Sequence, residues 1–118
     1  MSIRLKRVYD APDPRDGYRV LVDRLWPRGI SKDRAGLDEW AKDLAPSNEL
    51  RQWYHADRSH WAEFRQRYLA ELKAQSDHLR ELAARARTGE VTLLYAAADP
   101  DQNHAIVLME AIKKYAAS

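Results

Sequence analysis

Two short, uninterrupted apolar runs constrain the fold most strongly. Val20-Leu21-Val22 lies inside residues 18–23, and a second run extends from Val91 to Ala97. A strand with one solvent-exposed face alternates apolar and polar residues, whereas a strand covered on both faces is apolar throughout. Ile3 to Tyr9 alternates and predicts a further strand. Continuous runs of this kind are typical of a parallel sheet with helices on its faces.

Amphipathic segments follow the predicted strands. Apolar residues recur every three or four positions between 61 and 86, and again between 105 and 112. We expect helices that begin at Ser47, at Ser59 and near Ser76, and a helix stop at Gly89. Residues 37–45 fit a short strand or a helix, and the following proline favours the strand. The sequence therefore predicts an α/β fold, with a small, mainly parallel sheet flanked by helices in a single three-layer domain over residues 1–118.

Several protein classes are excluded by what the sequence lacks. It contains no cysteine, so disulfides and thiolate chemistry are ruled out. No apolar run approaches the roughly 20 residues that span a bilayer, and the N-terminus contains no apolar signal region. Glycine-rich nucleotide loops and the zinc-peptidase and serine-hydrolase motifs are absent. We expect a cytoplasmic protein with no cofactor, no metal and no membrane contact.

Positive charge is concentrated in the N-terminal third. Residues 1–34 contain nine Lys and Arg against five Asp and Glu, whereas the rest of the chain contains eleven against thirteen. This distribution suits an anionic partner, whether a phosphate, a carboxylate or a nucleic-acid backbone. The alternative is a solvated surface combined with internal ion pairs.

The first candidate site segment is Asp23 to Gly29, directly after a predicted strand. Ligands of open α/β sheets bind beyond the carboxyl ends of the strands. Arg24 and Arg28 offer planar guanidinium groups that suit a carboxylate or phosphate, Trp26 would wall the site, and Asp23 would orient an arginine. The structural alternative is an Asp23–arginine pair that locks the loop around a buried tryptophan.

The second candidate segment lies between the strand ending near Ala97 and the last helix. A strand-to-helix junction offers free backbone N–H groups to an anion, and Asn103 adds an amide. His104 is a candidate general acid or base, with Tyr95 and Asp23 behind it. Alternatively, an aspartate at 99 or 101 caps the helix and the neighbouring polar side chains bond the loop.

The third candidate group is Pro46-Ser47 with Arg51, Tyr54 and His55, in which Ser47 and Arg51 lie four residues apart at a predicted helix start. This spacing places the hydroxyl and the guanidinium on one helix face, where both can bind one anion. The alternative is a serine that only caps the helix and an arginine that only faces solvent.

Taken together, these residues resemble a known family. Residues 16–29 are similar to the opening of the bacterial YeaO-like proteins, the domain-of-unknown-function family 488. The similarity continues through Leu37-Asp38-Glu39-Trp40, Ala45-Pro46-Ser47, Thr92-Leu93-Leu94-Tyr95 and Gln102-Asn103-His104-Ala105. The resemblance implies a small cytoplasmic bacterial α/β protein and brings no established activity. Some members are labelled methyltransferases, which the missing glycine-rich loop does not support, and others contain cysteines that this chain lacks.

We therefore expect a pocket for a small anionic ligand at the carboxyl ends of the strands. The expected binding residues are Arg24, Trp26, Arg28, Ser47, Arg51 and Asn103. The pattern offers no nucleophile, so it leaves open whether the pocket is catalytic. Two alternatives stay open: a nucleic-acid-binding module that uses the basic N-terminal third, and a structural or regulatory protein without a ligand.

Overall fold

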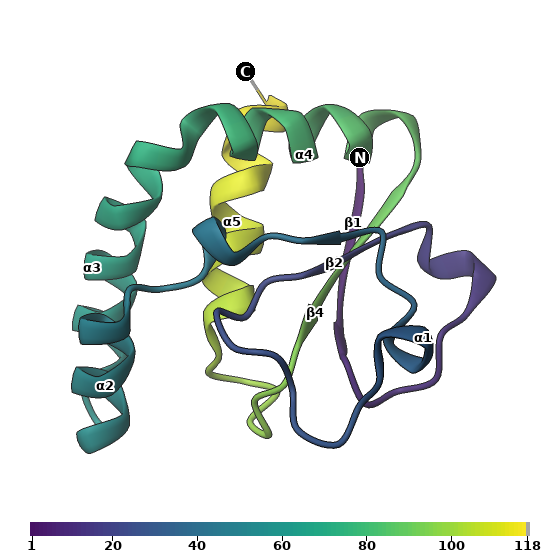
Figure 1. The fold of residues 1–118 in the computed structure, drawn as a ribbon. Coiled ribbons are helices and arrows are strands. Elements are labelled where there is room, and N and C mark those ends of the chain that lie inside the picture. Colours follow the sequence, from purple (N-terminus) through teal and green to yellow (C-terminus); the bar gives the residue numbers. More distant parts are fainter. Residues whose placement is uncertain (118) are drawn as a thin grey trace.

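A computed structural model describes residues 1–117 and contains one four-stranded sheet (Figure 1). Its strands are β1 (Ser2–Arg7), β2 (Tyr18–Leu21), β3 (Glu39–Trp40) and β4 (Glu90–Tyr95). The strand order is β1-β4-β2-β3, and every neighbouring pair is parallel. The predicted α/β fold with a mainly parallel sheet is confirmed. Since β2 and β4 are adjacent and parallel, the segments that follow them emerge at the same edge.

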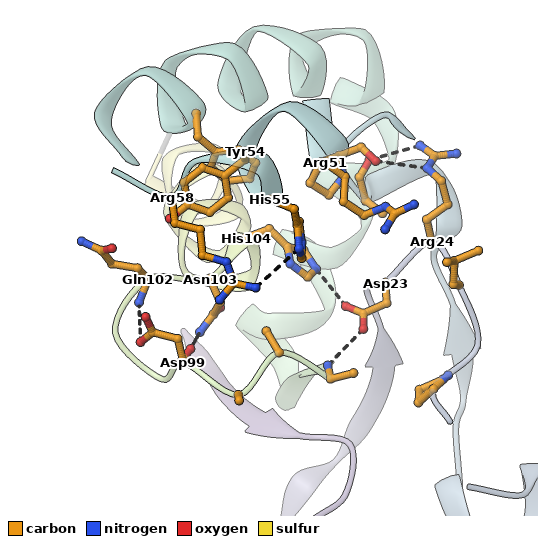
Figure 2. A pocket seen from close by; sticks show the side chains of 18 of the residues that line it. Asp23, Arg24, Arg51, Tyr54, His55, Arg58, Asp99, Gln102, Asn103 and His104 are labelled. Atoms are coloured by element: carbon orange, nitrogen blue, oxygen red, sulfur yellow. Dashed lines mark hydrogen bonds and ion pairs between the residues drawn. The ribbon is translucent and has the colours of Figure 1, made fainter. Parts of the chain in front are cut away.

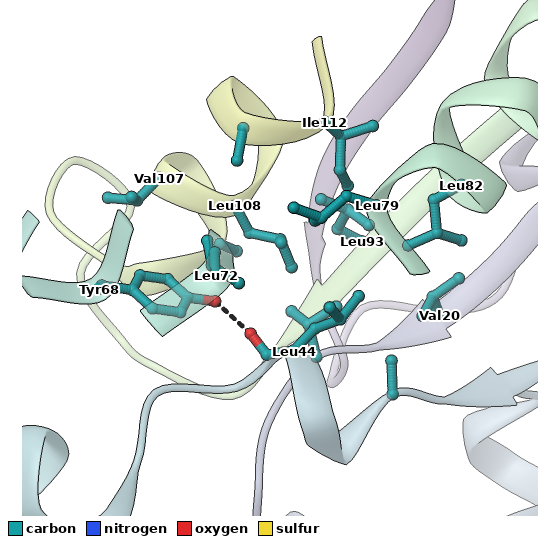
Figure 3. Close-up of a cluster of buried hydrophobic side chains, with 14 of the residues drawn as sticks. Val20, Leu44, Tyr68, Leu72, Leu79, Leu82, Leu93, Val107, Leu108 and Ile112 are labelled. Carbon is teal, nitrogen blue, oxygen red and sulfur yellow. Dashed lines mark hydrogen bonds between the residues drawn. The ribbon is translucent and has the colours of Figure 1, made fainter. Parts of the chain in front are cut away.

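The longer helices form the main core with one face of the sheet. They are α2 (Asn48–Ala56), α3 (Trp61–Leu72), α4 (Ser76–Thr88) and α5 (His104–Ala117). Figure 3 shows Leu79 and Leu82 of α4 and Leu108 of α5 gathered over Leu93 of β4. Their spacing of three or four residues is what places them on one helix face. No helix in the described part of the chain is long and apolar enough to cross a membrane.

The opposite face of the sheet carries a thinner layer. It consists of the connections 8–17 and 22–38, which contain the short helices η1 (Pro14–Asp16) and α1 (Lys32–Ala35). Beneath them lies a small apolar cluster of Val8, Leu21, Ile30, Ala35 and Leu94. This layer therefore consists mostly of loops, and only short helices accompany them.

A buried ionic cluster holds this thin layer in place. The carboxylate of Asp16, fully buried, accepts hydrogen bonds from Lys6 Nζ and from the guanidinium of Arg19. Arg19 also donates to the carbonyl oxygens of Ala35 and Gly36. Burial alone would raise the pKa of Asp16, but the hydrogen bonds from Lys6, from a backbone N–H and from Arg19 outweigh it and lower that pKa. The cluster thus neutralises part of the basic N-terminal third internally.

Three local predictions need correction. Within residues 37–45 only Glu39–Trp40 forms a strand, and the 3-10 helix η2 (Lys42–Leu44) follows it. Ser59 does not cap α3, which begins after His60; the backbone N–H of Ser59 instead donates to Asp57. The expected break near 75 is present as η3 (Lys73–Gln75), but no side chain caps the start of α4.

The side chain of His78 links α4 to the edge of the sheet. Its Nε2 lies 2.5 Å from a carboxylate oxygen of Glu39, and its Nδ1 lies 2.7 Å from one of Asp43. Burial alone would lower the pKa of His78, but the hydrogen bonds to Asp43 and Glu39 outweigh it and raise that pKa. The protonated ring can donate to both carboxylates at once, which a neutral ring cannot do.

The interactions of His78 with the two carboxylates predict a contribution to stability that depends on pH. The folded-state pKa of His78 is raised, so its contribution is complete below the unfolded pKa of about 6.5 and is lost as pH rises through the folded pKa. Urea unfolding should therefore show a gap in unfolding free energy between wild type and His78→Gln that narrows from about pH 6 to about pH 9. His60→Gln, at a half-exposed histidine, is the control. An equal difference in unfolding free energy at both pH values would contradict a stabilising role for protonated His78.

Candidate functional site

A cavity of about 430 Å³ opens where β2 and β4 end (Figure 2). Its walls come from the loop after β2, the loop before α2, α2 itself, and the loop between β4 and α5. Ligand sites of open α/β sheets lie at this edge, and their volumes usually fall between about 300 and 1,000 Å³. The cavity is therefore large enough for a small metabolite.

The carboxylate of Asp23 fixes the floor of this cavity. Its Oδ2 accepts the backbone N–H of Ala96 at 3.0 Å, which ties the end of β2 to the end of β4. Its Oδ1 lies 2.9 Å from Nε2 of His104, the first residue of α5. That nitrogen is also 3.0 Å from the carbonyl oxygen of Val22. Asp23 thus pairs with a histidine and a backbone N–H, and the expectation that it orients an arginine is wrong.

Four arginines line the cavity: Arg24, Arg28, Arg51 and Arg58. Arg24 is anchored, because its guanidinium donates to the carbonyl oxygens of Ala45 and Pro46 at 3.3 and 3.1 Å. Arg28 is exposed and makes no hydrogen bond or ion pair with any described residue. With two aspartates, Asp23 and Asp99, in the same wall, the lining has an excess of two positive charges.

Arg51 differs from the other cavity arginines in having a buried polar atom without a partner in the described chain. Its Nε is buried and has no hydrogen-bond partner among the described residues. A buried donor without an acceptor costs about 1–3 kcal/mol, and more when the group is charged. Arg51 thus places an unsatisfied donor of a charged group in the cavity wall.

His55 of α2 stands among these cations. Burial, followed by the charges of Arg58, Arg51 and His104, lowers its pKa. Its Nδ1 lies 3.4 Å from a guanidinium nitrogen of Arg58. Figure 2 shows Arg24 and Arg51 on one side of the two histidines and Arg58 on the other. The site therefore presents positive charge at both ends.

The start of α5 is held by its own side chains. Asn103 accepts the backbone N–H of Ile106 through Oδ1 and donates through Nδ2 to the carbonyl oxygen of Asp99. The carboxylate of Asp99 accepts the backbone N–H groups of Asp101 and Gln102. The helix cap is thus Asn103, and Asp99 closes the preceding turn. Both side chains fix the shape of the cavity wall.

The structure brings most of the predicted site residues together. Arg24, Arg28 and His104 line one cavity, as the strand-end argument predicts, and Trp26, Arg51 and Asn103 join them. Trp26 has a structural role as well: its Nε1 donates to the carbonyl oxygen of Ile30, and its ring packs edge-on against Trp40 at 5.2 Å. The structural alternative, an Asp23–arginine pair that locks the loop around a buried tryptophan, is not found among the described residues, because Asp23 pairs with His104 and Trp26 is only partly buried.

Two predicted site residues lie elsewhere. Ser47 caps α2 and donates its hydroxyl to Glu71 at 2.6 Å, in a shallow groove between α2 and α3. Tyr95 is 5% exposed and packs in the main apolar core. The alternation of strand side chains turns Tyr95 to the helix-covered face. Neither residue is placed to contact a ligand in the cavity.

Sequence reasoning passed over Arg58, and it grouped His55 with Arg51 but gave it no role in binding. His55 lies four residues after Arg51 in α2, and Arg58 lies three residues after His55, just beyond the end of this helix. This spacing is the signal that would have found them. Phe64, expected to belong only to the core, is 3% exposed and also forms part of the cavity wall. Among the described residues no cluster of histidine and acidic side chains is arranged to hold a metal ion.

Comparison with known proteins gives a consistent result. The model of a family described as the inactive DUF488-N3 subclade matches residues 2–118. The uncharacterized protein YeaO of Escherichia coli K12 is 50% identical over 110 residues, which cover 93% of this chain and 96% of that protein. The uncharacterized protein Mb3100c of Mycobacterium bovis is 46% identical over 110 residues, covering 92% and 91%. No solved structure matches significantly.

Substitutions of Arg24 and Arg51 should have different effects on the free energy of unfolding. Arg24→Met removes the hydrogen bonds to Ala45 and Pro46 and should lower the unfolding free energy by about 1–3 kcal/mol. Arg51→Met removes a buried donor that has no partner and should leave the unfolding free energy unchanged or higher. Urea unfolding in a chloride buffer measures both. A loss for Arg51→Met as large as that for Arg24→Met would show that Arg51 is a structural residue.

Proposed function

This chain belongs to the family described as the inactive DUF488-N3 subclade, and from that premise we propose that it binds a small dianion without transforming it. The observation that carries the proposal is the guanidinium of Arg51, whose buried Nε has no acceptor among the described residues. The excess of two positive charges in the cavity wall suits a ligand with two negative charges. A phosphate group carries about −1.5 to −2 at pH 7.

The geometry around His104 favours binding over catalysis. Both groups near its Nε2, Asp23 Oδ1 and the carbonyl oxygen of Val22, are acceptors, so this nitrogen carries a hydrogen. Nε2 therefore cannot remove a proton from a ligand, and in a neutral ring only Nδ1 keeps a lone pair. The lining contains no serine or cysteine that could act as a nucleophile. These features agree with the word inactive in the family description.

A small ligand also explains the charge pattern better than a nucleic acid does. Four of the nine basic residues of the N-terminal third form ion pairs: Arg4 with Glu90, Lys6 and Arg19 with Asp16, and Arg15 with Asp13. A nucleic-acid surface requires several free cations along a continuous face. Of the cations without an ion pair, Arg24 and Arg28 line the cavity, and the side chains of Lys32 and Arg34 lie on the short helix α1 away from it.

Anion binding should stabilise the fold through this cavity. Sulfate at ten times its dissociation constant should add about 1.4 kcal/mol and raise the melting temperature by about 5 °C relative to chloride of equal ionic strength. Arg28→Ala should abolish most of this rise. Arg87→Ala, which removes an exposed arginine in the last turn of α4, before β4 begins, should keep it.

Thermal melts of the three proteins in both salts provide the measurement. Sulfate also stabilises proteins by exclusion from their surfaces, and that effect is shared by all three. The proposal fails when the sulfate-dependent rise is the same in Arg28→Ala as in wild type.

Binding should also be linked to proton uptake at His55. Burial, Arg58, Arg51 and His104 lower the pKa of His55 in the free protein, and a bound dianion opposes this effect. Sulfate binding should therefore tighten several-fold from about pH 8 to about pH 5.5, a range in which sulfate itself does not titrate. Calorimetric titrations in buffers with different ionisation enthalpies measure the proton uptake. His55→Gln should reduce it and the control His60→Gln should not; equal uptake in all proteins would exclude His55 as its source.

A further inference from the structure

The cavity wall has an apolar part that inorganic anions do not need. Among the described residues three large apolar side chains are exposed, and two of them, Tyr9 at 39% and Leu25 at 60%, line this cavity. Exposed apolar side chains that are rimmed by charged groups mark ligand grooves. The ligand is therefore expected to carry an apolar group beside its charge.

Aromatic rings dominate this apolar part. Trp26, Tyr54 and Phe64 line the cavity together with Tyr9. Tyr54 and Phe64 stack with ring centroids 4.4 Å apart, which makes a rigid wall. Figure 2 shows Tyr54 beside Arg58, on the side of the cavity away from Arg24 and Arg51. Flat rings and a guanidinium plane are the surfaces on which another flat ring stacks best.

One polar group remains at this ring-lined end. Gln102 lines the cavity, is exposed, and its side-chain amide makes no hydrogen bond with any described residue. A primary amide offers donors and an acceptor together, which matches the polar edge of a heteroaromatic ring. The two ends of the cavity therefore differ: one has Arg24 and the uncompensated Arg51, and the other has Tyr54, Arg58 and Gln102.

We infer that the ligand is a phosphate monoester of a flat aromatic or heteroaromatic group, a class that includes aryl phosphates and nucleoside monophosphates. The phosphate contacts Arg51 and Arg24, and the ring stacks at the end with Tyr54 and Arg58. This inference rests on the proposed function, which supplies the anion site, and it adds the ring. Burial of a ring in such a wall adds affinity in proportion to the apolar area removed from water.

Calorimetric titration of the full chain tests the inference with inorganic phosphate, phenyl phosphate and uridine 5′-monophosphate, and with phenol and uridine as the neutral counterparts. At least one of the two monoesters should bind at least ten times more tightly than inorganic phosphate, a difference of about 1.4 kcal/mol. The neutral compounds should bind far more weakly than their phosphates. The tighter of the two monoesters identifies whether the ring is aryl or heteroaromatic.

Two variants separate the parts of the site. Gln102→Ala, at the exposed amide of the ring-lined end, should weaken the tighter monoester at least threefold and affect inorganic phosphate less. Arg51→Met should weaken inorganic phosphate and the monoester alike, because it removes the donor that contacts the phosphate, and Arg87→Ala should weaken neither. If inorganic phosphate binds but neither monoester binds more tightly, the ring is wrong and the anion site stands. If none of the phosphates binds, both the inference and the proposed function are wrong.

Discussion

The carboxylate of Asp23 joins the three elements that define the cavity. It receives the backbone N–H of Ala96 just after β4, lies 2.9 Å from Nε2 of His104 at the start of α5, and belongs to the loop that leaves β2. The backbone carbonyl oxygen of Asp23 also accepts a hydrogen bond from the indole of Trp40 in β3. The parallel sheet brings these ends together, and Asp23 holds them in one arrangement.

The distribution of ion pairs explains why the free positive charge is found at this edge. On the thinner side of the sheet, Asp16 takes up Lys6 and Arg19, and this buried cluster anchors the loops that cover β2 and β4. At the cavity, by contrast, Arg24 donates to two backbone carbonyl oxygens. The side chains of Arg28 and Arg51 have no acceptor in the described chain. A fold that had only to be stable would not need a guanidinium whose buried Nε has no partner among the described residues.

Much of this arrangement follows from local sequence patterns. The apolar runs around Leu21 and Leu93 predict buried parallel strands, and the strand-end rule then places Arg24, Arg28 and His104 at one edge. Ser47 shows the limit of that reasoning, since its hydroxyl is taken by Glu71, 24 residues away in sequence. Tyr95 differs in another way: a continuous apolar strand does not tell which side chains face the cavity edge and which face the core. Pairings between distant segments are set by tertiary packing, which local patterns do not encode.

The most direct test of the account observes the side chain of Arg51 itself. The Nε–H groups of arginines give separate signals in ¹H–¹⁵N correlation spectra, and Arg19, whose Nε donates to the carbonyl oxygen of Gly36, is an internal reference. During a sulfate titration at constant ionic strength, the Arg51 Nε–H signal should shift progressively and saturate, because the bound anion becomes its acceptor. The Arg19 signal should stay in place. An Arg51 signal that does not move while sulfate reaches saturating concentrations would contradict the proposal that this cavity binds an anion.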